Sequence, residues 1–439
     1  DGPDVREKVQ RLKVHPVKYA VGVVPLKAEE FNWVKIEDAN SIALVTFGRY
    51  PEYNYLDEIK ITGNLKTPMT IEGFNYKNYL LKDGIYSVMD FPKIELVSKD
   101  HNYNLYSRFY EKVLLLKKNL IKSIDYNFST PQNFIVYGVI LGNDKNTPKD
   151  LKDKFNVTGL SHITAVSGGN IVILINLLIP LLLILGFWRG QAFYFSIVFI
   201  WLYILLTGLP VSGIRAAIMG SAFLLAEKVG RKSDSSRIIM LTATLMLIKN
   251  PLLLIYDIGF QLSFLASMGI IYLKPIIDNL IKLNKKEYVL AKNNVNENKW
   301  TESIKKLIHK KANYLLDIIS VTLAAQIFVL PVIIYNFGNI SLVAPITNLL
   351  IIPIIPYLMI FGFASAIMGI FSSFLGWVFY LPSWILLTYF LGVIDIFYTS
   401  WSAKIITNVS IVWLIIYYII LYILIWYLSK KIKPKFLGY

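Results

Sequence analysis

Apolar stretches of nearly membrane-spanning length recur along this sequence and constrain its fold more than any other feature. They begin after residue 130 and continue to residue 428, and many approach the ~20 residues that a helix needs to cross ~30 Å of hydrocarbon. With 55% apolar residues and a mean hydropathy of +0.51, the 439-residue chain is too hydrophobic for a water-soluble protein of its size. The sequence therefore predicts a polytopic α-helical membrane domain.

About nine apolar segments make up this predicted domain, and several are short or broken by Gly and Pro, which indicates broken or re-entrant helices. Interrupted helices persist at membrane depth only where the freed backbone groups are buried in protein or line a wet cavity. This pattern favours a pore or transport site, and kinks without functional meaning are the alternative. The segments are 171–188, 191–209, 212–226, 238–248, 251–273, 313–336, 339–371, 373–400 and 403–428.

Short β-branched runs separated by polar, Gly or Pro turns come before the apolar half. About five such runs, in this pattern, are typical of a small antiparallel barrel. We expect a soluble domain over 1–104 with the fold of an OB-like β-barrel. The runs are 16–26, 41–47, 57–63, 84–88 and 93–97.

A stretch with helical periodicity follows, with apolar residues on one side and five basic residues between them over 105–122. This pattern predicts an amphipathic helix that lies on the membrane surface, within a segment 105–130. An ordinary solvated helix that packs on the barrel is the alternative. The channel-forming part of the chain is then expected over 131–439.

Basic residues are concentrated in the apolar half. Residues 1–155 hold 23 Lys and Arg against 20 Asp and Glu, whereas 156–439 hold 22 against 9. A basic loop over 274–312 and the lysines near the C-terminus are expected in the cytoplasm by the positive-inside rule. The nearly neutral N-terminal domain is expected outside, although composition alone does not settle its side. The basic excess permits a polyanionic ligand without proving one.

Several kinds of chemistry are disfavoured by composition. The chain has no cysteine, and its four histidines show no metal-ligand spacing, so we expect no metal and no cofactor. No nucleotide-binding loop is visible in the sequence, which agrees with an energy source outside this chain. The chain starts Asp1-Gly2-Pro3 without methionine, which indicates missing upstream sequence.

A polar segment over 159–170 leads directly into the apolar segment that begins at residue 171. Its polar side chains suit the lining of a wet cavity and make poor lipid-facing surface. A hydrolase would instead use Ser167 as nucleophile and His162 as base. Because they lie five residues apart with no carboxylate nearby, structural hydrogen bonding or pore lining is favoured. The candidates here are Ser161, His162, Ser167 and Asn170.

Arg215 lies near the start of an apolar segment. An arginine near the membrane centre costs at least ~2.5 kcal/mol on insertion scales, so it needs a partner, water or a functional reason. Asp257 is the expected partner, and snorkelling of the side chain toward the headgroups is the alternative.

Single polar side chains also occur inside later apolar segments. Asp257 and Gln261 lie four residues apart and are expected on one helix face. Gln326 and Asn348 repeat the pattern. Each alone is explained by a contact between helices, but together with Arg215 they predict an internal polar seam along a hydrated path.

At these motifs the chain resembles the ComEC family, the membrane channel of bacterial natural transformation. The matching segments occur in the family's order and include ITGNLKTPMTIEGFNYKNYLLKDGIY, LGNDKNTPKDLKDKF, TGLSHITAVSGGN, TGLPVSGIRAAIMG, DIGFQLSFLASMGI and AAQIFVLPVIIYNFGNISLVAPITNLLIIP. The resemblance implies an extracytoplasmic OB-like domain and a membrane domain that admits one DNA strand. By matching position it implies roles in the pore or its support for Ser161, His162, Ser167, Arg215, Asp257, Gln261 and Gln326.

Two departures from the family limit this transfer. The family usually has SG-Leu-His where this chain has Ser167-Gly168-Gly169-Asn170, so a role for that second histidine does not carry over. The His-x-His-x-Asp-His signature of the family's metallo-β-lactamase-like nuclease is absent, as are the membrane helices that precede the barrel. Strand degradation is then expected in a separate nuclease or in a further part of the protein beyond these 439 residues.

The resulting hypothesis is a non-catalytic channel in the bacterial cytoplasmic (inner) membrane that translocates single-stranded DNA. Its expected partners are the DNA strand, membrane lipids, a DNA receptor outside and an ATP-driven motor in the cytoplasm. A small-solute or lipid transporter is the first alternative, and an intramembrane hydrolase is the second.

Overall fold

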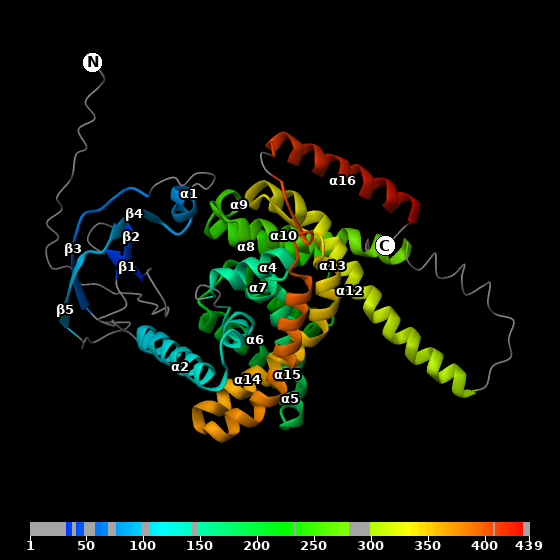
Figure 1. Cartoon of the computed structure of the whole chain (residues 1–439), viewed down its shortest axis with the longest axis horizontal. Helices are drawn as coiled ribbons and strands as arrows, with labels where there is room; N and C mark the ends of the chain where they lie inside the picture. The colour runs from blue at the N-terminus through cyan, green and yellow to red at the C-terminus, as the bar shows by residue number, and fades with distance from the viewer. Residues whose placement is uncertain are drawn as a thin grey trace, which may run out of the picture. The chain divides into compact units, whose positions relative to one another are not determined.

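The computed structural model describes residues 32–36, 41–47, 58–68, 76–98, 105–142, 147–231, 234–280, 299–406 and 409–432. The chain divides into two compact units (Figure 1). We call the first, residues 1–119 and 247–257, the strand unit, and the second, residues 120–246 and 258–439, the helical unit. Helix α2 (Leu105–Asn127) runs from one into the other.

A three-stranded sheet forms the first part of the strand unit. Its central strand β2 (Ser41–Thr46) pairs antiparallel with β1 (Asn32–Ile36) and parallel with β4 (Ile85–Asp90). Three consecutive residues of β2, Ala43 to Val45, are buried. A strand flanked on both edges and covered on both faces reads as a continuous apolar run, as SIALVT does.

The remaining strands of this unit, β3 (Glu58–Thr62) and β5 (Lys93–Ser98), form a separate antiparallel pair. Short helix α1 (Tyr76–Leu81) packs its buried Leu80 against Leu44 and Ile85 of the first sheet. Four of the five predicted strand runs are confirmed, and the run at 16–26 lies outside the described residues. Strand β1 was missed because NWVKI is short and mixes polar with apolar residues.

The predicted closed barrel is not found among the strands that the structure describes. Strand β2 takes β1 and β4 as its neighbours, which leaves β3 and β5 to pair with each other. The result is two small sheets in place of one closed sheet.

The helical unit is built of helices with short breaks. Six stretches in the described part of the chain are long and apolar enough to cross a membrane, which confirms a multi-pass membrane protein: Arg189–Thr207, Ile258–Leu280, Leu315–Phe337, Ala344–Phe371, Ser373–Phe397 and Ile411–Lys431. The elements, with α9 from the strand unit's second segment included, are α3 (Gln132–Val136), η2 (Tyr137–Leu141), α4 (Lys149–Thr158), η3 (Ser161–Ile163), α5 (Gly168–Ile184), α6 (Arg189–Thr207), α7 (Val211–Lys228), α8 (Ser235–Lys249), α9 (Leu253–Tyr256), α10 (Ile258–Met268), η4 (Gly269–Leu273), α12 (Lys299–Phe337), β6 (Asn339–Ser341), α13 (Ala344–Ile351), η5 (Ile352–Ile354), α14 (Ile355–Phe371), α15 (Ser373–Phe397), β7 (Ala403–Ile405) and α16 (Ile411–Ile432).

Three of the nine predicted segments are broken. Segment 251–273 divides at Asp257, whose backbone is extended between α9 and α10. Segments 339–371 and 403–428 open with β6 and β7, which pair antiparallel with each other. The predicted basic loop at 274–312 is also partly helical, because the helix after η4 continues to residue 280 and α12 already begins at Lys299.

Pairwise contacts between helices run in a closed circuit through the helical unit. Helices α5, α6 and α7 pack on one another, α7 packs on α10, and α10 packs on α12. The contacts continue through α13, α15 and α14 to the π-helical turn η2. A hydrogen bond from Asn170 Nδ2 of α5 to the Val139 carbonyl of η2, 3.3 Å long, closes the circuit.

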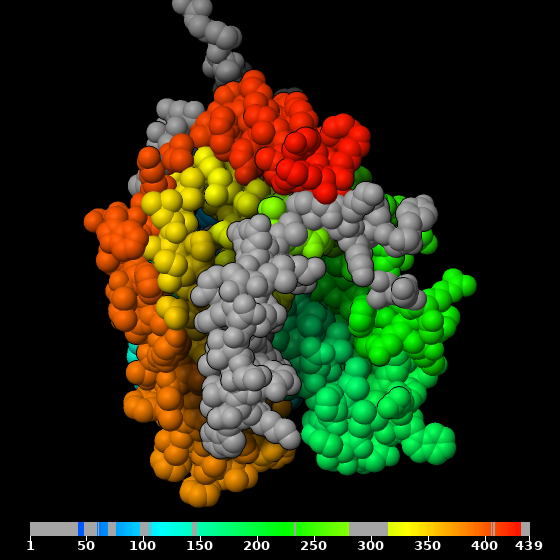
Figure 2. Space-filling model, turned by 90° about the vertical axis from the view of Figure 1, so that its right-hand side faces the viewer, coloured from blue at the N-terminus to red at the C-terminus, as the bar shows by residue number. Residues whose placement is uncertain are grey.

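Figure 2 shows two sides of this circuit on one face of the helical unit. Yellow and orange atoms of α12–α15 stand on one side and green atoms of the α6–α8 region on the other, with darker teal atoms set back between them.

The second π-helical turn, η4, approaches α12 so closely that a Cβ on Gly269 would collide with the Ala324 carbonyl. π-Helical turns of this kind are frequent at functional sites.

Candidate functional site

The polar loop, defined as residues 159–167 between α4 and α5, is fixed on one side by η2. A Cβ on Gly138 would lie 2.7 Å from Thr164 Cβ, and a Cβ on Gly142 would overlap Val166. Only glycine permits so close an approach, and Gly142 also has a positive φ of 62°. Loop and turn therefore pack in direct contact.

Helix α7 holds the same loop from another side. Ser212 Oγ, in the first turn of α7, donates a 2.7 Å hydrogen bond to the Val166 carbonyl. The loop's own polar groups pair locally, because Ser161 Oγ donates to Asn156 Oδ1 at 2.6 Å. Contacts from η2 and α7 thus hold the polar loop in place directly before the start of α5.

His162 is accessible on the loop, and its Nδ1 lies 3.2 Å from the Gly159 carbonyl. Although part of the side chain reaches solvent, desolvation by the surrounding protein lowers the pKa of the imidazole, and the hydrogen bond to Gly159 opposes this shift. Because a carbonyl oxygen only accepts, Nδ1 carries the hydrogen in this contact.

The serine of the hydrolase alternative does not meet its proposed base. Ser167 Oγ donates to Asn170 Oδ1 at 3.2 Å, while His162 bonds to the Gly159 carbonyl. No hydrogen bond joins Ser167 to His162 in the described structure. A nucleophile needs its base within hydrogen-bond reach, so this geometry does not form a Ser–His pair.

Arg215 lies in the second turn of α7, with only 8% of its surface exposed. Its Nη1 donates a 2.7 Å hydrogen bond to the Ser263 carbonyl and another to Ser267 Oγ, both on α10. The guanidinium also lies over the Phe264 ring, 5.9 Å from its centroid. Its Nε has no hydrogen-bond partner among the described residues.

The predicted Arg215–Asp257 pair is wrong, since the arginine's partners are the serines of α10. Sequence reasoning missed them, although Ser263 and Ser267 are four residues apart and share one face of that helix. The spacing in FQLSFLAS was the available signal. No carboxylate is paired with Arg215 in the described part of the chain.

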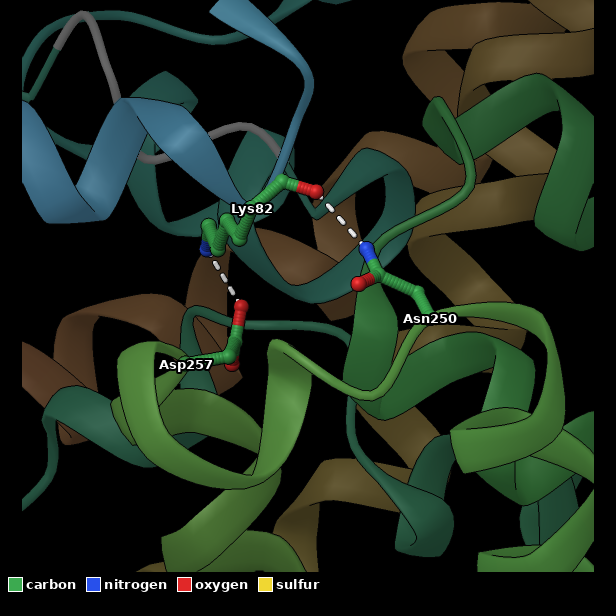
Figure 3. Close-up of polar contacts among 3 residues, drawn as sticks. All are labelled: Lys82, Asn250 and Asp257. Carbon is green, nitrogen blue, oxygen red and sulfur yellow. Dashed lines mark hydrogen bonds and ion pairs between the residues drawn. The ribbon is translucent and has the colours of Figure 1, made fainter.

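Asp257 belongs to the strand unit, where its carboxylate forms an ion pair with Lys82 (Figure 3). Both side chains are buried, 8% and 5% exposed, and Lys82 Nζ also lies 4.2 Å from the centroid of the Tyr79 ring. Asn250 Nδ2 donates a 2.7 Å bond to the Lys82 carbonyl. We call Lys82, Asn250 and Asp257 the lysine lock.

Asp257 does not share a helix face with Gln261, because its backbone is extended and α10 begins only at Ile258. Gln261 and Gln326 are half-buried on α10 and α12, two helices that pack together. Asn348 is buried on α13, and its Oδ1 lacks a hydrogen-bond partner among the described residues. Among the described candidates, Ser167 bonds to Asn170, and Arg215 Nη2 approaches Gly168 at the start of α5.

The described residues contain no cluster of three or more His, Cys, Asp or Glu side chains able to hold a metal ion. Around Arg215 the described residues instead supply the Ser263 carbonyl, the Ser267 hydroxyl and, at Gly168, the start of α5.

Comparison with known proteins defines the class. The family model described as Competence protein matches residues 139–431, well over half of the chain. This multi-pass membrane protein therefore belongs to the Competence protein family, which confirms the resemblance drawn from its motifs.

A curated relative agrees with this assignment. The chain is 26% identical over 355 residues to "ComE operon protein 3" of Bacillus subtilis (strain 168). The alignment covers 80% of this chain but 39% of that protein, so the chain spans well under half of the relative's length. No solved structure matches the chain.

Proposed function

We propose that this chain forms the channel through which single-stranded DNA crosses the bacterial cytoplasmic membrane during natural transformation, without making or breaking bonds itself. The observation that carries the proposal is the Competence family match across residues 139–431, which includes the polar loop, Arg215 and the α12–α15 region. The proposed partners are the DNA strand, membrane lipids, a DNA receptor outside and a cytoplasmic ATP-driven motor, and strand degradation belongs to a separate nuclease or to a further part of the protein.

The interior of the helical unit supports a polyanionic cargo. Arg215 brings a positive charge among the helices with no paired carboxylate in the described residues, and its Nε is unpartnered. Ser263 Oγ and Asn348 Oδ1 are buried and likewise lack protein partners there. In hydrocarbon such groups cost several kcal/mol each, so a hydrated path that holds a strand accounts for them better than a dry bundle does.

The lysine lock supports an orientation in the membrane. Because Lys82 contacts residues 250–257, the strand unit lies on the side of the membrane where Ile258–Leu280 begins. That span then delivers the basic residues after it to the other side. By the positive-inside rule this other side is the cytoplasm, so the strand unit is extracytoplasmic.

The β6–β7 pair is consistent with that orientation. Two candidate spans, Ala344–Phe371 and Ser373–Phe397, separate the paired strands, so the chain crosses twice and returns to the same side. One further crossing by α16 brings Lys430 and Lys431 to the cytoplasm together with the basic stretch at 274–312.

Domain organisation completes the proposal: a soluble domain over 1–104, a surface helix within 105–130 and the channel domain over 131–439. Helix α2 supports a position at the membrane surface, since it exposes Leu105, Phe109 and Leu116 at helical spacing. Large apolar side chains exposed along one face of a helix with lysines beside them suit the interface between lipid and water.

The test is uptake of labelled DNA by cells that carry this protein, one of its variants or no copy of it. Arg215→Ala is compared with wild type and with Arg237→Ala at matched membrane levels, because Arg237 is an exposed arginine on the neighbouring α8. We expect nuclease-resistant DNA to fall sharply for the first variant only. Normal uptake in cells that lack the protein altogether would contradict the proposal and favour a small-solute or lipid transporter.

A further inference from the structure

The start of α5 is a helix N-terminus without its usual side-chain cap. Ser167, with φ −116° and ψ 167°, has the backbone of a capping residue, but its hydroxyl makes no cap bond and donates instead to Asn170 Oδ1. The first backbone N–H groups of a helix have no intrahelical acceptor, and the positive end of the helix dipole lies there. A helix of 17 residues therefore begins with unused donors beside the polar loop.

Arg215 is directed at this helix start. A Cβ placed on Gly168 would lie 3.2 Å from Arg215 Nη2, so the guanidinium touches the first residue of α5. Both of its hydrogen bonds use Nη1, whose partners on α10 anchor the other edge of the group. Arg215 is more than nine-tenths buried, and its Nε has no acceptor in the described residues.

The uncapped helix start and the guanidinium are independent observations, and both place positive charge at the same point. Backbone amides and a planar guanidinium are all donors, and a tetrahedral oxyanion accepts from such a set with several oxygens at once. No ion pair neutralises Arg215 within the described chain, so the charge is free to serve a ligand. The absent side chain at Gly168 leaves room for the guanidinium to approach.

We propose that Arg215 and the first turn of α5, from Ser167 to Asn170, bind a phosphodiester group. The proposal rests on the proposed function, because the passing strand supplies that phosphodiester, and it assigns the point where the channel holds the strand's backbone. Contacts to phosphate carry no base information, so the site takes every sequence equally. A phosphodiester lipid headgroup has the same chemistry and is the other source.

Gly168→Ala and Gly169→Ala are the matched pair that tests the site. A Cβ at 168 would lie 3.2 Å from Nη2, so the flexible end of Arg215 must give by a few tenths of an ångström, whereas a Cβ at 169 meets only Ser167 Oγ at 3.5 Å, an ordinary contact. Both are alanines in the first turn of one helix, so their folding costs are alike. Arg215→Gln and Arg215→Lys complete the series.

The measurement is binding of a fluorescent oligothymidylate to the full chain in phosphatidylcholine nanodiscs over a range of salt concentrations. For single strands the logarithm of affinity falls with the logarithm of salt by about 0.7 per phosphate contacted. We expect Gly168→Ala and Arg215→Gln to weaken binding several-fold and to reduce this slope by about 0.7, one phosphate. Gly169→Ala should match wild type, and Arg215→Lys should keep the slope but lose affinity.

Two further arms separate the sources of the phosphodiester. A methylphosphonate oligothymidylate, whose backbone is neutral, should bind wild type and Arg215→Gln equally. If oligothymidylate binding ignores Arg215 but phosphatidylglycerol in the nanodisc raises the melting temperature of wild type and not of Arg215→Gln, the site holds a lipid headgroup. If neither probe distinguishes the variants, the site is wrong, while DNA uptake in cells still decides the proposed function separately.

Discussion

Lys82 of the strand unit and Arg215 of the helical unit are both buried cations, but the protein satisfies them in opposite ways. In the strand unit, Lys82 has the carboxylate of Asp257, the face of Tyr79 and an asparagine on its carbonyl. In the helical unit, Arg215 has two serine oxygens, the ring of Phe264 and no carboxylate among the described ion pairs. The two side chains are similarly buried, so burial alone does not explain the difference.

The comparison teaches how to separate a structural charge from a working one. A buried charge is costly unless it is paired and hydrogen-bonded. Lys82 meets that requirement from within the protein, and nothing is left for a ligand to add. Arg215 does not meet it, and a chain that keeps an incompletely satisfied arginine inside a membrane unit implies a use for it.

Asp257→Asn is the change with the largest expected effect on stability. It leaves the Lys82 ammonium buried without its counter-charge, which costs about 3–5 kcal/mol. The apparent melting temperature of the purified protein in detergent, followed by size-exclusion fluorescence, measures the loss. Removing both partners, with Lys82→Met and Asp257→Asn together, should restore much of it.

Asp90→Asn is the control for that experiment. Asp90 pairs with Lys66 in the same unit, 3.4 Å apart, but both side chains are about half exposed. Exposed pairs contribute less than about 1 kcal/mol, so this variant should melt near wild type. Equal losses for Asp257→Asn and Asp90→Asn would show that the lysine lock is not the buried pair described above.

Arg215→Met should cost little stability but much DNA uptake. It removes two hydrogen bonds, worth about 1–3 kcal/mol together, and strands no carboxylate, so it should melt well above Asp257→Asn. DNA uptake at matched membrane levels should nevertheless fall about tenfold or more, the effect of losing one charged contact of ~1.4 kcal/mol. If Arg215→Met unfolds as readily as Asp257→Asn, Arg215 is a structural residue like Lys82, and the difference between the two cations disappears.

Asn250→Ala tests the neutral part of the lysine lock. The change leaves the ion pair in place but removes both the 2.7 Å donor to the Lys82 carbonyl and the 3.1 Å acceptor of the Leu252 N–H, so we expect a loss of about 1–3 kcal/mol. Hydrogen exchange of residues 76–98 should quicken modestly. Exchange as slow as in wild type would mean that the ion pair alone fastens this segment.

His162 should contribute the smallest effect. Unlike Lys82 and Arg215, it is a basic side chain whose surroundings favour the uncharged form. Its pKa is lowered by desolvation in the folded protein. As the pH falls, His162 therefore binds a proton more readily in the unfolded chain than in the folded protein. Stability should therefore be fully present above the ordinary histidine pKa of ~6.5 and decline as the pH falls below it. The melting temperature of His162→Gln should fall less than that of wild type between pH 7 and pH 5.

The membrane architecture and the family were predictable from the sequence because long apolar segments and local motifs are local properties. The four strands within 41–47, 57–63, 84–88 and 93–97 followed from β-branched runs for the same reason. Strand pairing is not local, so the two-sheet arrangement in place of a closed barrel was not visible.

Partners of the polar residues were the part that sequence reasoning could not supply. Asp257 was matched with Arg215 because both were charges in apolar surroundings, but its true partner lies 175 residues away in the strand unit. Opposite charge shows which residues could pair, but it does not show which of several candidates does. The partners of Arg215, Ser263 and Ser267, were missed as well, although their spacing of four residues places them on one helix face.

The split make-up of the strand unit also fixes an order of events during biosynthesis. Residues 247–257 belong to this unit, so it cannot be completed when its first 119 residues leave the ribosome. At ~5–20 residues per second, the 175 residues between Lys82 and Asp257 take roughly 9 to 35 s to synthesise. During that interval Lys82 stays hydrated, and the strand unit closes only after α3 to α8 have been made.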